Sequence, residues 1–104
     1  MEKFCMVEVA FGSKEEAEKV ISSLLDKKLV ASCQMIESQS YWNWENSRES
    51  GCEYLLFLKT KNTLLSEIYK EIRAIHSYEC FEFAVFPFDS YSKGYLTWIQ
   101  KEVK

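Results

Sequence analysis

The only histidine of the chain, His76, begins a segment in which three kinds of metal-binding group occur close together. Residues 76–82 read His-Ser-Tyr-Glu-Cys-Phe-Glu, so an imidazole is followed by the carboxyl of Glu79, the thiol of Cys80 and the carboxyl of Glu82. Imidazole titrates near neutral pH, whereas carboxylate and thiolate suit different metals. His76 and Glu82 are therefore the predicted metal ligands, with Glu79 as an alternative oxygen ligand.

The same residues also have a purely structural interpretation. A histidine at the C-terminal end of a helix often bonds the last carbonyl groups, and a carboxylate such as that of Glu82 can accept hydrogen bonds from a neighbouring helix end. One chain also supplies too few ligands to close a site, so a metal needs matching groups from a second subunit. Metal binding and structural capping both stay open for His76 and Glu82 on sequence grounds.

Composition predicts one compact domain over residues 1–104, because 47% of the residues are hydrophobic. Thirteen basic residues are spread among 16 acidic ones and the net charge is -3, which disfavours nucleic-acid binding. The N-terminal apolar run is interrupted by Glu8, so it reads neither as a signal peptide nor as a membrane span. We expect a cytoplasmic protein without a membrane partner, in which the four cysteines are reduced and packed as small apolar residues.

Catalytic machinery is not indicated by any motif. No serine or cysteine lies in a nucleophile motif, and with three glycines the chain has no glycine-rich phosphate loop. We therefore expect no catalytic residues and no enzymatic activity.

The first half of the chain predicts a strand, a helix and a long hairpin. Residues 3–11 alternate as a strand, with one face formed by Cys5, Val7, Val9 and Phe11. Residues 13–16 form a capping box, followed at helical spacing by Ala17, Val20, Ile21, Leu24 and Leu25. Residues 29–36 are extended and lead to an aromatic segment, and Glu45-Asn46 predicts a reversal into a strand over residues 52–59.

The second half predicts a second helix, a fourth strand and a terminal helical segment. Asn62 or Thr63 is the expected cap of the helix, whose apolar stripe consists of Leu65, Ile68, Ile72 and Ile75. Residues 81–88 read as a strand whose end is marked by Pro87, and residues 95–103 suit a short helix or an irregular docking segment after a loop.

This order of elements predicts an α+β fold, the ferredoxin-like split βαβ sandwich, with an antiparallel sheet and a long hairpin between its second and third strands. Two helices cover only one face of such a sheet. Residues 54–58 and 83–86 are nevertheless apolar on both faces of the predicted strands, whereas a strand with one solvated face alternates apolar and polar residues. The second face should therefore be buried by another copy of the chain or by another protein, and a closed homo-oligomer is the commonest solution.

Several segments match a known set of motifs in order and spacing. Residues 28–32, Lys-Leu-Val-Ala-Ser, resemble a Lys-Leu-Ala-Ala-Cys motif, and residues 44–46, Trp-Glu-Asn, resemble Trp-Glu-Gly. Residues 76–82 resemble His-Pro-Tyr-Glu followed by Pro-Glu, and residues 95–98 reproduce Tyr-Leu-x-Trp. Over nearly its whole length, to Trp98, the chain resembles the CutA family of divalent-cation tolerance proteins.

The resemblance implies a tight homotrimer in which three sheets face one another and each hairpin reaches a neighbour. It implies a role in the response to metal ions, with copper or another divalent cation bound at an intersubunit cleft near His76 and Glu82, and no established enzymatic reaction. The alternative is a PII-like trimeric regulatory module that binds a small ligand or a partner protein and has no direct metal role.

Two departures from the family pattern affect these expectations. Ser77 and Phe81 stand where family members usually have proline, so we expect a less rigid turn after the second helix. Val9 occupies the place of a first-strand cysteine that some members are thought to use for copper, so that site is incomplete here. The aromatic residues are consistent with a ligand pocket or with subunit packing, and comprise Tyr41, Trp42, Trp44, Tyr95 and Trp98.

Overall fold

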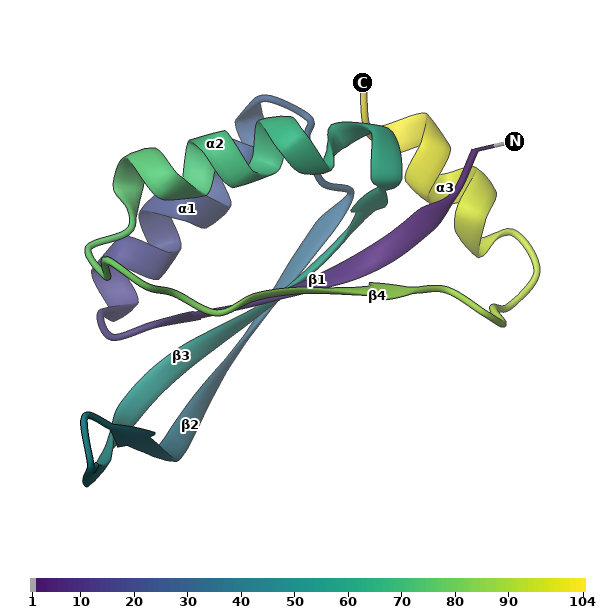
Figure 1. The fold of residues 1–104 in the computed structure, drawn as a ribbon. Helices are drawn as coiled ribbons and strands as arrows, with labels where there is room; N and C mark the ends of the chain where they lie inside the picture. Colours follow the sequence, from purple (N-terminus) through teal and green to yellow (C-terminus); the bar gives the residue numbers. More distant parts are fainter. Residues whose placement is uncertain (1) are drawn as a thin grey trace.

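The computed structural model describes residues 2–104, which form one four-stranded sheet and three α-helices (Figure 1). The strands are β1 (Phe4–Phe11), β2 (Ser32–Trp44), β3 (Ser47–Lys61) and β4 (Phe83–Pro87). The helices are α1 (Lys14–Asp26), α2 (Leu65–Ile75) and α3 (Tyr95–Glu102). None of the helices within residues 2–104 has the length and apolar character needed to cross a membrane.

The sheet has the strand order β2-β3-β1-β4, and every neighbouring pair is antiparallel. Helices α1 and α2 lie side by side over one face, while the hairpin formed by β2 and β3 extends beyond the helical layer (Figure 1). The predicted split βαβ sandwich with its long hairpin is therefore confirmed.

The core lies between the sheet and the helices, where the predicted periodicities meet. Val7, Val9 and Phe11 of β1 are fully buried on the helix-facing side, as the alternation predicted, and so are Ile68 and Ile72 of α2. Burying an apolar side chain of this size contributes about 1.5–3 kcal/mol, so this layer is the main source of stability. The four cysteines are free, as expected, but only Cys5 is buried in the core. Cys33 is half-buried, and Cys52 and Cys80 are exposed, so the expected core packing is wrong for the last two.

Helix α1 begins at the predicted cap but uses only half of the capping box. The Ser13 hydroxyl accepts a hydrogen bond from the Glu16 amide at 3.2 Å. The Glu16 carboxylate turns elsewhere and accepts the Ser77 N–H at 2.9 Å. The start of α1 is thereby joined to the turn that follows α2.

The start of α2 differs from the prediction. Asn62–Leu64 form a 3₁₀ turn, α2 begins at Leu65, and no side chain caps it. The Thr63 hydroxyl instead donates to the carboxylate of Glu2 at 3.3 Å. A long-range partner therefore replaces the local cap.

Strand bounds also differ from the prediction in two places. The segments expected separately at residues 29–36 and 41–44 belong to one continuous strand, β2, because β3 pairs with it along its whole length. Strand β4 begins at Phe83 and not at Phe81, because the Phe81 ring stacks on His76 on the helix side. The reversal at Glu45-Asn46 is confirmed, with φ of 47° and 68°, in the left-handed region that asparagine tolerates well.

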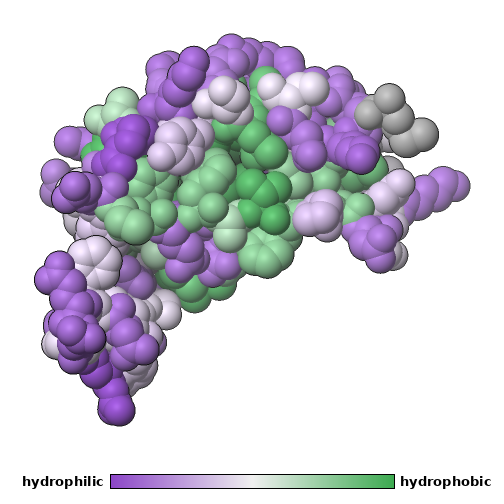
Figure 2. Space-filling view, in the orientation of Figure 1, coloured by the Kyte–Doolittle hydropathy of each residue, from purple (hydrophilic) through white to green (hydrophobic). Residues whose placement is uncertain are grey.

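The face of the sheet opposite the helices is open and largely apolar. Helix α3 packs with the helical layer, since Ile99 is fully buried in the same core, and it leaves this face uncovered. Ile36 pairs with Leu55 across β2 and β3, and Phe86 pairs with Met6 across β4 and β1. Ile36 is 52% exposed and Phe86 46% exposed. Figure 2 shows apolar side chains gathered along the β4 side of the molecule, in contrast to the hydrophilic hairpin tip.

Candidate functional site

The structure buries His76 at the C-cap of α2, directly after the last helical residue, Ile75. The backbone N–H of His76 donates to the Ile72 carbonyl at 2.8 Å, so the predicted position at the helix end is correct. Its imidazole is stacked between two rings, with centroids 4.2 Å from Phe11 and 4.5 Å from Phe81. The side chain is fully buried.

Both ring nitrogens of His76 have protein partners. Nε2 lies 2.7 Å from the carbonyl oxygen of Ala10, and Nδ1 accepts the Tyr78 N–H at 3.1 Å, which fits the neutral tautomer that carries its proton on Nε2. Burial lowers the pKa of His76 and outweighs the opposing effects of the Ala10 hydrogen bond and the Glu16 carboxylate. A metal would have to break one of these bonds, so a direct ligand role for His76 stays a prediction.

The turn after α2 is tied down by Arg73 in place of the family prolines. Its guanidinium donates to the carbonyls of His76, Tyr78 and Glu79 at 3.1, 2.6 and 3.0 Å, and lies 4.7 Å from the Phe81 ring centroid. Three carbonyl contacts and a cation–π contact offset the expected loss of rigidity at residues 77 and 81.

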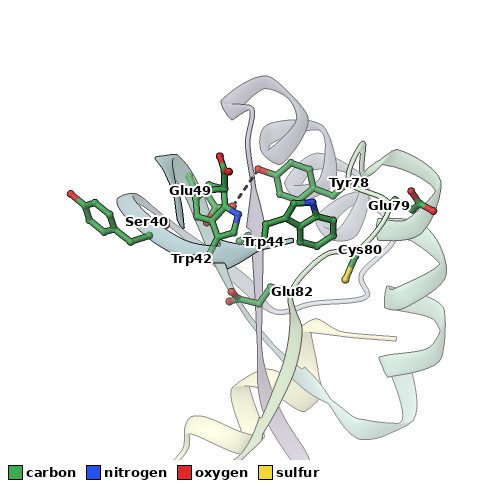
Figure 3. Close-up of a pocket in the computed structure, with 11 residues that line it drawn as sticks. Ser40, Trp42, Trp44, Glu49, Tyr78, Glu79, Cys80 and Glu82 are labelled. Carbon is green, nitrogen blue, oxygen red and sulfur yellow. Dashed lines mark hydrogen bonds between the residues drawn. The ribbon is translucent and has the colours of Figure 1, made fainter. Parts of the chain in front are cut away.

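This turn and the β2–β3 hairpin enclose an open cleft of about 1120 Å³ (Figure 3). Glu79, Cys80 and Glu82 all line it, as their proximity in sequence suggested, whereas His76 lies behind it in the core. The lining combines aromatic rings, carboxyl groups and small residues, and consists of Ala10, Ser40, Tyr41, Trp42, Trp44, Glu49, Glu53, Tyr78, Glu79, Cys80 and Glu82.

A carboxyl that the sequence did not single out lies beside Glu82. Glu8 of β1 is opposite Ala84 of β4, on the open face of the sheet, which places its carboxyl beside that of Glu82. Burial, the neighbouring Glu8 carboxyl and the charge of Glu53 raise the pKa of Glu82 to about 7. The sequence did contain a signal for this residue, because Glu8 is the only charged residue in an otherwise apolar strand and shares a strand face with Met6.

With its pKa raised to about 7, the Glu82 carboxyl beside Glu8 can hold a proton near neutral pH. Two carboxyl groups do not close a metal site. Among residues 2–104, no group of three histidine, cysteine or acidic side chains is close enough to hold a metal ion. Further ligands must come from water or from another chain.

We expect replacing Glu82 by glutamine to make stability less dependent on pH. The pKa of Glu82 is about 7 in the fold and 4.5 without the shift, so the folded chain binds more protons between these values and its free energy of unfolding falls as pH rises through that window. Exposure and solvent screening reduce the effect to about 1 kcal/mol. The free energy of unfolding of Glu82→Gln minus that of the parent should therefore be about 1 kcal/mol larger at pH 8 than at pH 4. Denaturant unfolding at the two pH values measures both differences.

The exposed helix residue Glu18 provides the control for this prediction. Glu18→Gln should differ from the parent by the same amount at both pH values. An identical difference at both pH values for Glu82→Gln would contradict the raised pKa.

An antiparallel sheet with two helices on one face defines a split βαβ protein of the α+β class. A family model described as the CutA1 divalent ion tolerance protein matches residues 5–102. The chain belongs to this CutA1 divalent ion tolerance protein family, as the motif resemblance predicted.

Individual relatives agree with this assignment. The chain is 33% identical over 92 residues to a divalent-cation tolerance protein CutA from Archaeoglobus fulgidus, covering 88% of this chain and 90% of the relative. It is 30% identical over 99 residues to the protein of the same name from Pyrococcus horikoshii, covering 95% and 97%. The solved structure of the A. fulgidus protein superposes with a TM-score of 0.92 at 30% identity, covering 97% of this chain and 99% of that one.

Proposed function

We propose that this chain acts in the response to divalent metal ions as a cytoplasmic homotrimer without enzymatic activity. We further propose that it binds copper or another divalent cation at an intersubunit cleft beside Glu82. The observation that carries the metal proposal is that strand pairing brings the carboxyls of Glu8 and Glu82 together on the open face, where a divalent cation could be held between them.

The open face of the sheet supports the proposed trimer. Its apolar side chains would be covered by the sheets of two other copies, which removes a surface that a monomeric soluble protein rarely exposes. Glu8 lies among these side chains, opposite Phe57 on one side and Ala84 on the other. A neighbouring subunit that covers the face would also bring ligands to the carboxyl pair.

The proposed cation ligands are Glu82 and Glu8, with His76 in a supporting position. Copper is expected to bind most tightly among the divalent first-row metals that carboxylates can hold. His76 orients the turn that carries Glu82 through its bond to the Tyr78 amide. A direct copper contact by His76 is tested in the same experiment.

Titration calorimetry with copper(II) tests this proposal. Glu82→Gln should weaken copper binding by at least about tenfold, equal to about 1.4 kcal/mol, while Glu18→Gln leaves the affinity unchanged. The parent should release about half a proton per site at pH 7, measured as the dependence of the heat on the buffer's ionisation enthalpy, because the pKa of Glu82 is about 7.

The double variant His76→Gln, Glu82→Gln separates the two roles of the histidine. If His76 only orients the turn, its replacement adds little to the loss caused by Glu82→Gln, whereas a direct ligand adds a second loss of similar size. Unchanged copper affinity in the double variant, with the assembly intact by light scattering, would contradict direct metal binding here. That result would favour the PII-like alternative.

A further inference from the structure

We propose that the hairpin end of the cleft is a second ligand site, which binds a linear organic polyamine between aromatic rings and carboxylates. This end consists of Trp42, Trp44, Tyr78, Glu49 and Glu53, and it is called the aromatic site below. The inference goes beyond the proposed cation binding, since it concerns another class of ligand and side chains other than Glu8 and Glu82.

In the single chain the two indole rings of the aromatic site are partly exposed to solvent. Trp42 is 39% exposed and Trp44 54% exposed, although both line the cleft. Figure 3 shows these two indoles and the Tyr78 phenol gathered at one end of the cleft, with Glu49 beside them. The faces of such rings attract organic cations by about 0.5–2 kcal/mol per contact.

Tyr78 is held in place before any ligand arrives. Its hydroxyl donates to Oε2 of Glu53 at 3.2 Å, and its ring lies 4.9 Å from that of His76. The hydroxyl oxygen lies 2.5 Å from the position that a Cβ on Gly12 would occupy. Any side chain at residue 12 would therefore clash with the phenol in this position. Binding a ligand against the Tyr78 ring would therefore cost little additional side-chain entropy.

Trp42 packs on the hairpin itself. Its ring lies 3.7 Å from the position that a Cβ on Gly51 would occupy, which is an ordinary van der Waals distance, so the indole packs beside the neighbouring strand β3. Strand pairing places Trp42 opposite Glu49, which brings a ring and a carboxylate together on the same face.

The charges of the cleft select a cation. Four of its eleven lining residues are glutamates and none is lysine or arginine, so nothing in the lining neutralises them. Carboxylates favour a cation that donates N–H hydrogen bonds over a quaternary ammonium, which has none. The two carboxylates of the aromatic site, Glu49 and Glu53, favour more than one positive charge on the ligand, as in a linear polyamine.

Metal binding does not explain the aromatic site. Within residues 2–104, no three ligating side chains converge, and indole rings do not replace the oxygen and nitrogen ligands of a hydrated divalent ion. A cleft of about 1120 Å³ is also far larger than a single ion requires. The ring-and-carboxylate combination therefore matches an organic cation better than an inorganic one.

Spermidine is the probe for the test, measured by calorimetry and by tryptophan fluorescence. A Trp98→Phe background leaves Trp42 and Trp44 as the two reporters, since the chain has three tryptophans. Spermidine should bind and change this fluorescence, with an affinity that falls between about 20 and about 200 mM NaCl as screening increases. Tetramethylammonium should bind at least about tenfold more weakly, because it donates no N–H bond.

Two variants probe the rings and the carboxylates separately. Trp42→Ala, and the double variant Glu49→Gln, Glu53→Gln, should each weaken spermidine binding by about 3- to 30-fold. Glu18→Gln should leave it unchanged, and light scattering should show the parent's assembly in every variant. The glutamine variant keeps all the rings, so it still tests the site if Trp42→Ala alters the assembly.

Copper provides the test that separates this site from the carboxyl pair. Trp42→Ala should keep the parent's copper affinity, and Glu8→Gln should keep its spermidine affinity. Absence of spermidine binding to the parent at low salt would overturn the proposal. So would equal binding to the parent and to both aromatic-site variants, which would indicate nonspecific attraction to an acidic protein.

Discussion

Replacing His76 by alanine should lower the free energy of unfolding by about 3 kcal/mol near pH 8. The change opens a cavity between the rings of Phe11 and Phe81, and it leaves the Ala10 carbonyl and the Tyr78 amide without their partners. Denaturant unfolding at one fixed protein concentration measures this difference, because assembly would make the apparent stability depend on concentration.

The size of this effect should depend on pH. Burial lowers the pKa of His76 in the fold, so the unfolded chain binds the proton more readily and the parent loses stability as pH falls below about 6.5. His76→Ala removes that titration, and the difference between the two proteins should shrink from pH 8 to pH 5. His76→Gln keeps a donor for the Ala10 carbonyl and should recover part of the lost stability.

A small effect would contradict the structural role. If His76→Ala cost less than about 0.5 kcal/mol, as surface substitutions usually do, the ring could not be the buried link between β1 and the turn. A loss that stayed constant from pH 8 to pH 5 would contradict the neutral, buried imidazole.

The sequence predicted the fold well because its signals were local and periodic. Alternation along β1 identified Val7, Val9 and Phe11 as buried, and the 3.6-residue stripe of α2 identified Ile68 and Ile72. The predicted start of α2 was wrong because it depends on a contact that is not local. The partner of Thr63 is Glu2, 61 residues away, and no local pattern shows such a contact.

The candidate site was only partly predictable for the same reason. The motif at residues 76–82 located the turn, and three of its ligating side chains do line the cleft. His76, however, bonds the Ala10 carbonyl, 66 residues away, and Glu82 meets Glu8 only because β4 pairs with β1. Sequence proximity suggested one ligand cluster, whereas the tertiary structure separates the buried imidazole of His76 from the exposed Glu82 and its half-buried neighbour Glu8.

The effect of the missing prolines could not be predicted from the turn itself. Ser77 and Phe81 remove two rigid residues, but Arg73 of α2 bonds three carbonyls of the turn and Glu16 of α1 accepts the Ser77 amide. Side chains from two helices thus supply the restraint that the ring of proline would supply covalently.

Introducing one glutamate per chain on the open face should dissociate the proposed trimer into single chains. Ile36 and Phe86 are about half exposed in the single chain, so Ile36→Glu or Phe86→Glu should alter the stability of an isolated subunit by only about 0.5 kcal/mol. In a trimer the same carboxylate would be buried between sheets without a partner, at a cost of several kcal/mol per subunit. Light scattering at micromolar concentration should give the mass of one chain for both variants and of three for the parent.

Leu25 on α1 supplies the matched control, because it is an apolar side chain of similar exposure, 41%, on the helical layer. Leu25→Glu adds the same charge away from the open face and should leave the trimer intact. If both open-face variants kept the parent's mass, the three copies would not meet through this face. If the parent itself scattered as a folded monomer, the apolar face would have no partner in solution, and the carboxyl pair would have to complete its cation site from water alone.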